Sequence, residues 1–492
     1  MNIRTRFAPS PTGELHIGGA RTALFSYLFA KNRSGEFLLR IEDTDRERFV
    51  EGSVERIIES LNWLGIKADN KEPMIQSKRL EVYKKQAIKL VEEDKAYICT
   101  CSKEQLEKDR ERQIKEGKAP KYVGRCREKS QIAPRLRSGQ ANHPSTPSIT
   151  LGTSSLGASK SQTNSKFEIS KGAVIRMKMP KKGKIVVDDL IHGKVEFDSA
   201  LQDDQIILKS DGFPTYHLAS VVDDNEMGIS HVIRSDEWLS STPKHLELYK
   251  MFGWKAPFFA HLPMILGPDK KKLSKRHGAT SVLEYRDEGY LPEALINFIA
   301  FLGWNPKDER QDFTLPELER EFKLGNVNKS PAIFDLEKLN HINAYYLKSQ
   351  ISNLKSTGKI SNLSEGESQL IGRGGFNTVK EVEEYIKKLR NEPEYDPALL
   401  IFKKSDKEKT LKGLEASSCQ LSAISDWNLN TIQKKLEEVV TKEGLSNGDV
   451  FWPVRVALSG EEKSPSPVEL IIALGKEKSL DRIQRAINRL KN

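Results

Sequence analysis

Cysteine and long apolar runs are scarce in this chain of 492 residues. Its four cysteines are too few for a disulfide framework, so we expect a protein of a reducing compartment. No apolar run approaches the roughly 20 residues that cross a membrane, and the first residues carry no signal-peptide pattern. These absences predict a cytoplasmic protein with neither a disulfide scaffold nor a membrane span.

Positive charge is what the chain has in excess. Lysine and arginine number 79 against 69 aspartate and glutamate, which gives a formal net charge of +10. Such an excess favours a polyanionic partner such as nucleic acid. The chain is also too long for one hydrophobic core, and the usual domain size predicts about three or four domains.

The first motif lies within residues 6–31. Its apolar start is broken by two prolines and Gly13, which predicts a buried strand that ends in a fixed loop. Apolar residues then recur at helical spacing. His16, Gly18 and Gly19 therefore lie where a loop enters a helix N-terminus, which suits phosphate, and glycine lets a nucleotide approach the backbone. An ordinary strand–helix turn is the alternative for this stretch alone.

Strand and helix patterns alternate over the next segment. Residues 36–45 predict a second strand that ends in acidic residues, and open parallel sheets bind ligands at this end of their strands. Glu42 is therefore placed to meet a cation such as an α-ammonium group, although an acidic helix start without a ligand is the alternative. Amphipathic patterns over 53–64 and 80–94 predict two helices, so we expect a doubly wound α/β domain.

A cysteine group comes next. Cys99, Cys101 and Cys126 have the spacing of a tetrahedral zinc site, in which a third thiol across a loop joins two close ones. The fourth ligand would be Tyr122 or Glu128. Three reduced cysteines packed as small apolar residues are the alternative.

The middle of the chain combines a polar segment with short strands. Residues 130–165 are rich in Ser, Thr, Gly, Pro and Asn, which predicts a flexible insertion. Short strands are expected at 173–179 and 185–189, and 214–224 predicts a strand end or a helix lining a pocket. A further buried strand delivers Arg234 at its carboxyl end, where the planar guanidinium could grip a carboxylate or form an internal salt bridge.

A second motif, at 268–278, gathers lysines and an arginine around Leu273 and Ser274. Such a run is usually a solvated loop or a patch for nucleic acid. Helical patterns dominate from there onward, and the clearest lie at 291–301, 315–322, 336–347, 380–389 and 480–490.

Two of these motifs together resemble those of a known family. His16-Ile17-Gly18-Gly19 and Lys272-Leu273-Ser274-Lys275-Arg276 look like the two ATP motifs of class I aminoacyl-tRNA synthetases. The flanking segments 6–13, 40–45, 221–224 and 232–234 are similar to the bacterial-type glutamyl-tRNA synthetases. The resemblance covers nearly the whole chain apart from the insertion. It implies that glutamate and ATP form glutamyl-adenylate, whose acyl group then moves to the 3′ end of tRNA-Glu.

The resemblance also implies roles for individual residues. For ATP and its activation it implies Mg²⁺ and the side chains or backbone of His16, Gly18, Gly19, Lys272, Lys275, Glu237 and Trp238. For L-glutamate it implies Arg6, Ala8, Ser10, Glu42, Tyr216 and Arg234. In this scheme Glu42 holds the α-ammonium group, while Arg6 and Arg234 take the two carboxylates. Two arginines oppose glutamine, because an amide cannot replace a carboxylate in a bidentate grip.

The same resemblance implies four domains in a chain that we expect to be a monomer. They are a Rossmann-like doubly wound catalytic domain at 1–95 and 190–265, an inserted tRNA acceptor-end domain at 96–189, a stem-contact domain with the lysine loop at 266–350, and an all-helical anticodon-binding region at 351–492. Basic residues of the inserted domain would meet the tRNA backbone through salt-dependent contacts.

Some positions depart from the family pattern and leave alternatives open. Gly19 replaces the final His of the general class I motif, Ser220 stands where some relatives carry Asn, and Glu128 stands where zinc-bearing relatives often have His. The alternatives are a form that also charges tRNA-Gln and a glutaminyl-tRNA synthetase, which usually has a β-barrel C-terminal region. A short paralogue and the nucleotidyltransferases lack the appendages of this chain.

Overall fold

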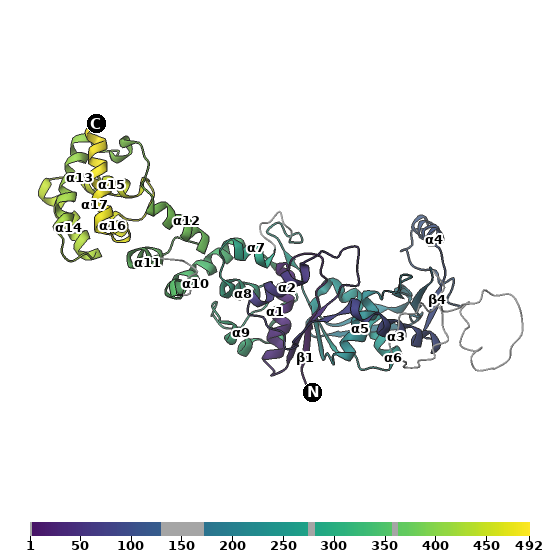
Figure 1. Ribbon diagram of the computed structural model, residues 1–492. Coiled ribbons are helices and arrows are strands. Elements are labelled where there is room, and N and C mark those ends of the chain that lie inside the picture. The colour runs from purple at the N-terminus through teal and green to yellow at the C-terminus, as the bar shows by residue number, and fades with distance from the viewer. Residues whose placement is uncertain (1, 129–171, 274–280, 357–362) are drawn as a thin grey trace, which may run out of the picture. The chain divides into compact units, whose positions relative to one another are not determined.

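The computed structural model describes residues 2–128, 172–273, 281–356 and 363–492 (Figure 1). The chain divides into two compact units. The first comprises Met1–Leu283 with Ile299–Phe334, and the second comprises Glu284–Phe298 with Asp335–Asn492. The predicted flexible insertion at 130–165 lies outside the described residues. Within the residues that the structure describes, no helix is long and apolar enough to cross a membrane.

A parallel sheet with crossover helices opens the first unit. Strands β1 (Arg4–Phe7) and β2 (Glu36–Ile41) pair in parallel, and β2 pairs in parallel with β3 (Met74–Ile75). Helix α1 (Ile17–Lys31) joins the first two strands, and α2 (Ser53–Trp63) precedes the third. Parallel neighbours need such crossovers, and both helices were predicted from their apolar spacing.

A second sheet continues the first one. Its order is β7 (Gly193–Asp198), β6 (Lys184–Asp189), β10 (Phe258–Leu262) and β9 (His231–Ser235), and β10 runs parallel to both β6 and β9. The Ser230 N–H donates to the Arg4 carbonyl over 2.9 Å, which places β9 beside β1. The strand order therefore reverses at β1, as in a doubly wound fold, and ligands of such folds bind at this switch point.

The predicted domain boundaries are finer than the two compact units and stay predictions. The strand β6, which falls within the predicted inserted domain 96–189, pairs in parallel with β10 of the second sheet.

The rest of the first unit carries a small antiparallel sheet and several helices. Its strands are β4 (Ala96–Cys99), β5 (Val174–Met177) and β8 (Ile206–Leu208), and the core against them includes residues of α3, α5 and α6. The remaining elements are α3 (Leu80–Glu92), α4 (Lys103–Lys115), α5 (Tyr216–Glu226), α6 (Thr242–Phe252), β11 (Ile265–Leu266), β12 (Ala332–Ile333) and α9 (Leu315–Glu321). Most of the stretch 214–224, for which the sequence predicts a strand end or a helix, thus belongs to the helix α5.

Helices make up the second unit. Glycine permits their close approach, because a Cβ at Gly413 would lie 2.1 Å from the Asp449 carbonyl oxygen. Over the described part of 351–492 every α or β element is a helix, which disagrees with a β-barrel C-terminal region. The helices are α10 (Leu336–Ser356), α11 (Glu365–Gly372), α12 (Val379–Arg390), α13 (Lys407–Ser422), α14 (Leu429–Glu443), α15 (Asn447–Ser459), α16 (Pro467–Leu474) and α17 (Lys476–Lys491). Helices α7 (Val282–Asp287) and α8 (Pro292–Ala300) each have residues in both units.

Candidate active site

A pocket of about 650 Å³ lies where the carboxyl ends of β1 and β9 meet the N-terminus of α1. Every described residue that the sequence implied for ATP or glutamate lines this pocket, although the two motifs lie more than 250 residues apart. These residues are Arg6, Ala8, Ser10, His16, Gly18, Gly19, Glu42, Tyr216, Arg234, Glu237, Trp238 and Lys272. Lys275 lies outside the described residues.

The N-terminus of α1 forms one wall of the pocket. His16 is the N-cap, and its Nδ1 accepts from the Gly19 N–H over 3.1 Å. A neutral His16 ring therefore carries its proton on Nε2. Desolvation and then the charge of Lys272 lower the pKa of His16, which favours the neutral ring at pH 7.

The two glycines of this motif have a packing role that the sequence argument did not foresee. A Cβ at Gly18 would lie 3.1 Å from the His16 ring, and one at Gly19 would lie 2.8 Å from Leu15 Cδ1. The Gly19 N–H is already used by the cap. Glycine here thus lets the histidine fold back over the helix start, in addition to any approach of a nucleotide.

Two residues that line the pocket, Lys272 and Glu237, form an ion pair. Their side chains are 71% and 45% exposed, and such surface pairs contribute at most about 1 kcal/mol. Opening this pair to free the lysine therefore costs little.

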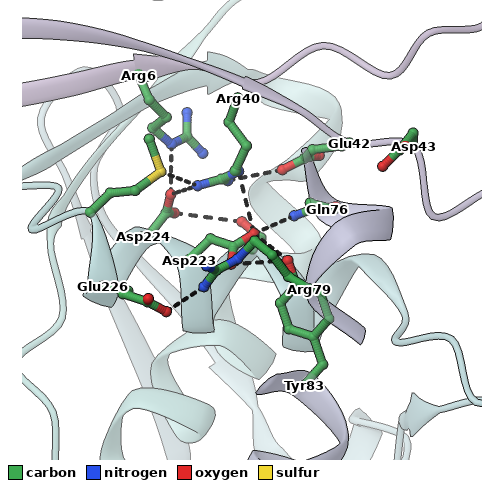
Figure 2. A network of polar contacts seen from close by, with 12 residues as sticks. Arg6, Arg40, Glu42, Asp43, Gln76, Arg79, Tyr83, Asp223, Asp224 and Glu226 are labelled. Carbon is green, nitrogen blue, oxygen red and sulfur yellow. Dashed lines mark hydrogen bonds and ion pairs between the residues drawn. The ribbon is translucent and has the colours of Figure 1, made fainter. Parts of the chain in front are cut away.

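A buried ion network adjoins the pocket, which its members Arg6 and Glu42 also line (Figure 2). We use this name for Arg6, Arg40, Glu42, Asp223 and Asp224. Arg40 is fully buried, and it donates to Glu42 over 2.9 Å and to Asp224 over 2.6 Å. Asp224 Oδ1 also accepts from Arg6 Nε over 3.0 Å, so one carboxylate oxygen holds two arginines. Asp223 in turn accepts from Gln76, Arg79 and Tyr83.

Charge pairing decides which form these carboxyl groups take. Burial raises the pKa of Asp224 while Arg40 and Arg6 lower it, and the net shift is downward. Burial dominates at Glu42 and raises its pKa despite the contact with Arg40. Asp224 is therefore held as the anion that orients both arginines. At Glu42 the contact with Arg40 does not offset the effect of burial, so a further cation beside Glu42 would stabilise its ionised form.

Arg234 lies in a different setting, which we call the Arg234 cage: Tyr216, the Trp238 carbonyl, Thr242, His245 and His261. Its Nε donates to His261 over 3.1 Å, and Nη1 donates to the Tyr216 hydroxyl over 2.7 Å and to His245 Nδ1 over 3.3 Å. The Nη2 group donates to Thr242 over 2.8 Å and to the Trp238 carbonyl over 3.3 Å.

The cage occupies the N–H groups of Arg234. All five have protein acceptors, so no bidentate fork is left open toward the pocket. Tyr216 Oη accepts from Arg234, which leaves the hydroxyl proton to donate. The predicted role of Arg234 in holding a carboxylate stays a prediction.

Several residues of these two clusters were missed by sequence reasoning. Arg40 begins the segment 40–45 that carries the resemblance, but it was given no role there. His261 belongs to no motif, because it lies in an apolar strand with the pattern of ordinary core. The only signals were a charged residue within a buried strand and the acidic pair that ends α5.

The cysteine group gathers as predicted, with Tyr122 among the thiols. The Sγ atoms of Cys99, Cys101 and Cys126 all lie within 4.8 Å of one another. The Tyr122 hydroxyl lies 3.4 Å from Cys99 Sγ and 3.5 Å from Cys101 Sγ. Glu128 is exposed. Three thiols and a hydroxyl on one centre suit a tetrahedral zinc ion, and Tyr122 is better placed than Glu128 as the fourth ligand.

Two family models match the chain. The model described as tRNA synthetases class I (E and Q), catalytic domain, matches residues 2–143 and 135–341. The model described as an anticodon binding domain matches residues 369–487. The fold and the pocket are therefore those of a class I tRNA synthetase with its anticodon-binding region.

Individual relatives narrow this class. A glutamate–tRNA ligase of Dehalococcoides mccartyi is 43% identical over 512 residues, which cover 99% of this chain and 98% of the relative. A glutamate–tRNA ligase 2 of Thermoanaerobacter pseudethanolicus is 41% identical over 503 residues with the same coverage. The crystal structure of a glutamate tRNA ligase from Elizabethkingia meningosepticum, in complex with its amino acid, matches with a TM-score of 0.80, 33% identity and 99% of each chain covered. The chain belongs to the glutamate–tRNA ligase family, as the two motifs predicted.

Proposed function

We propose that this chain is a glutamate–tRNA ligase that activates L-glutamate with MgATP and transfers it to the 3′ end of tRNA-Glu. The observation that carries the proposal is the convergence of both ATP motifs and the amino-acid residues on one pocket at the switch point of the sheet. We expect the chain to act in the cytoplasm and as a monomer.

The activation step needs positioning and charge stabilisation rather than a protein nucleophile. The glutamate α-carboxylate attacks the α-phosphorus of ATP, a P–O bond forms, and pyrophosphate leaves with the electrons of the broken bond. His16 Nε2–H and the start of α1 face the nucleotide, while Lys272 and Lys275 meet the leaving pyrophosphate. Each such preorganised group typically contributes roughly 3–4 kcal/mol to the transition state.

The amino-acid end of the pocket suits a substrate with two carboxylates and one ammonium group. Glu42 takes the ammonium, because its burial leaves it in need of a cation. Arg6 meets one carboxylate, and the Tyr216 hydroxyl backed by Arg234 meets the other. Ala8 and Ser10 line the wall between them. Glutamine offers an amide where the second carboxylate lies, so it leaves the charge of Arg234 without an anion.

We expect each unit to bind a different part of the tRNA, the second unit the anticodon and the first unit the acceptor end. The anticodon-binding match lies in the second unit, and the basic residues around the cysteine group belong to the first. This division favours a tRNA held by its anticodon while its acceptor end enters the pocket. Charging of tRNA-Gln in addition to tRNA-Glu is the alternative within the same family.

We test the function by pyrophosphate exchange with glutamate and with glutamine, each with and without tRNA, followed by charging of purified tRNA-Glu and tRNA-Gln. Glutamate-dependent exchange that requires tRNA is the expected result. Absence of exchange with glutamate, both with and without tRNA, contradicts the proposal. Charging of tRNA-Gln with glutamate selects the non-discriminating form, and charging with glutamine selects the glutaminyl enzyme.

Zinc is proposed for the cysteine group, with Cys99, Cys101, Cys126 and Tyr122 as ligands. A bound zinc ion would tie the loop around Cys126 to β4 and so stabilise this part of the fold. Metal analysis of the purified protein is expected to give about one zinc per chain. Cys126→Ser should lose the metal, while Cys419→Ser, at an exposed cysteine far along the chain, should keep it. A substoichiometric metal content favours packed thiols instead.

A further inference from the structure

A row of buried hydrogen bonds runs from Asp189 through His261 to Arg234. Asp189, His261 and Arg234 are 3%, 0% and 5% exposed. The His261 Nδ1–H donates to Asp189 Oδ2 over 2.6 Å, and Arg234 Nε donates to His261 Nε2 over 3.1 Å. The three residues lie on the neighbouring strands β6, β10 and β9, whose register pairs His261 with Arg234. The order of the sheet itself therefore assembles the row.

The row admits only one tautomer of His261. Arg234 Nε–H is always a donor, so His261 Nε2 must be the acceptor and the ring proton must lie on Nδ1. Desolvation lowers the pKa of His261 to about 4, in agreement with a neutral ring. Asp189 is fixed as the acceptor of that proton, because it also accepts the backbone N–H groups of Ile191 and His192, each over 2.9 Å.

The same row keeps acidic groups one step away from Arg234. Among the residues that the structure describes, no carboxylate lies within the 4.0 Å of an ion pair with Arg234. The second histidine behaves alike: His245 Nδ1 faces Arg234, and its other nitrogen lies 3.0 Å from His217 Nδ1. Neutral acceptors thus orient the guanidinium without neutralising its charge.

We propose that Asp189 and His261 are positioning residues for amino-acid specificity. They fix the orientation of Arg234 through a single histidine tautomer, and they leave its charge for the side-chain carboxylate of the substrate. Arg234 Nη1–H donates to the Tyr216 hydroxyl oxygen over 2.7 Å. This bond polarises the hydroxyl, whose own proton can then donate to that carboxylate. The inference rests on the proposed function, in which this end of the pocket holds glutamate.

Asp189→Asn tests the tautomer directly. An amide group in place of Asp189 Oδ2 would face the Nδ1–H of His261 with N–H donors, which favours the other tautomer. That tautomer points Nε2–H at Arg234 Nε–H, so Arg234 loses its orientation. We expect the KM for glutamate to rise about tenfold, the preference for glutamate over glutamine to fall, and the KM for ATP to stay within about twofold. Asp188→Asn, at the exposed neighbour on β6, is the matched control and should change neither KM.

His261 offers a loss and a rescue at one position. His261→Leu removes both nitrogens and should raise the KM for glutamate as Asp189→Asn does. His261→Gln supplies an amide oxygen near the place of Nε2, so it should restore most of the wild-type KM. A merely structural role predicts no such rescue. Equal KM values for glutamate in wild type, Asp189→Asn and His261→Leu overturn the inference.

Two readouts separate this inference from the proposed function and from misfolding. Wild-type exchange with glutamate tests the function, and only an active wild type makes the variants informative about Asp189 and His261. ¹⁵N NMR of histidine-labelled wild-type protein measures the tautomer of His261 in the unaltered fold. The variant His261→Gln serves only to identify which signal belongs to His261. A neutral Nδ1–H ring at His261 is expected, whereas an Nε2–H ring overturns the inference.

Discussion

Two buried arginines beside one pocket are stabilised in opposite ways. Arg40 lies among Glu42, Asp223 and Asp224, so its charge is compensated within the protein. Arg234 lies among neutral acceptors, and in the described parts of the chain no carboxylate pairs with it. A compensated charge holds the fold together, whereas an uncompensated buried charge remains available to an anionic ligand. The comparison predicts that the first arginine matters most for stability and the second for recognition.

Of the two arginine substitutions, Arg40→Met and Arg234→Gln, we expect Arg40→Met to cause the larger loss in the free energy of unfolding. It leaves the carboxylates of the buried ion network without their central cation, and breaking such a buried pair costs about 3–5 kcal/mol. Urea unfolding followed by tryptophan fluorescence measures the loss. Arg48→Met is the control, because Arg48 is 72% exposed in its pair with Asp45 and its removal should cost less than about 1 kcal/mol. Equal losses in the two variants would show that the network stabilises nothing.

Arg234→Gln should reverse this pattern. We expect kcat/KM for glutamate in pyrophosphate exchange to fall about 100-fold or more, roughly 3 kcal/mol, because the side-chain carboxylate of glutamate would lose the charge of Arg234 as its buried counter-charge. The free energy of unfolding should fall by only about 1–2 kcal/mol, since the acceptors that lose a partner are neutral. A loss of stability as large as that of Arg40→Met would erase the distinction between the two sites.

The sequence predicted the architecture, and of the two arginines compared it predicted a role for Arg234 but none for Arg40. The strands β1 and β2 and the helices α1, α2 and α3 followed from the residue patterns. The two ATP motifs, their flanking segments and the residues that the resemblance implied account for much of the pocket lining. The supporting residues could not be predicted in the same way. Arg40 finds its partners Asp223 and Asp224 more than 180 residues downstream, and Asp189 meets His261 only because β6 and β10 are neighbours in the sheet. Local periodicity shows that such a residue is buried but does not identify its partner.

The buried histidines of the Arg234 cage, His245 and His261, together with His217, which lies 3.0 Å from His245, also make the protein sensitive to acid. Desolvation lowers the pKa of His217 to about 3 and that of His261 to about 4, from 6.5, and it lowers the pKa of His245 well below 6.5. The unfolded chain therefore binds more protons than the folded chain below pH 6.5. Stability is fully present above this pH and falls as the pH drops toward the folded pKa values.

The carboxylates of the buried ion network behave differently over this range. Burial raises the pKa of Asp223 and of Glu42, so their protonation favours the folded state as the pH falls. The pKa of Asp224 is lowered, so it stays ionised until far more acidic conditions. Loss of stability on going from pH 6.5 to about pH 5 is therefore assigned to buried histidines, to which His231 outside the cage adds a share.

His217→Gln provides the smallest and most specific test of this assignment. Each buried histidine should contribute at most about 2 kcal/mol to the loss between pH 6.5 and pH 5, since a shift of one pKa unit corresponds to about 1.4 kcal/mol. Urea unfolding at the two pH values should show a smaller loss for His217→Gln than for wild type, because one of the titrating groups is gone. His341→Gln, at an exposed histidine, should retain the wild-type loss. If His217→Gln also retained the wild-type loss of stability, His217 would not be a source of the acid sensitivity. The contrast with the buried ion network would then have to rest on Arg40 and Arg234 alone.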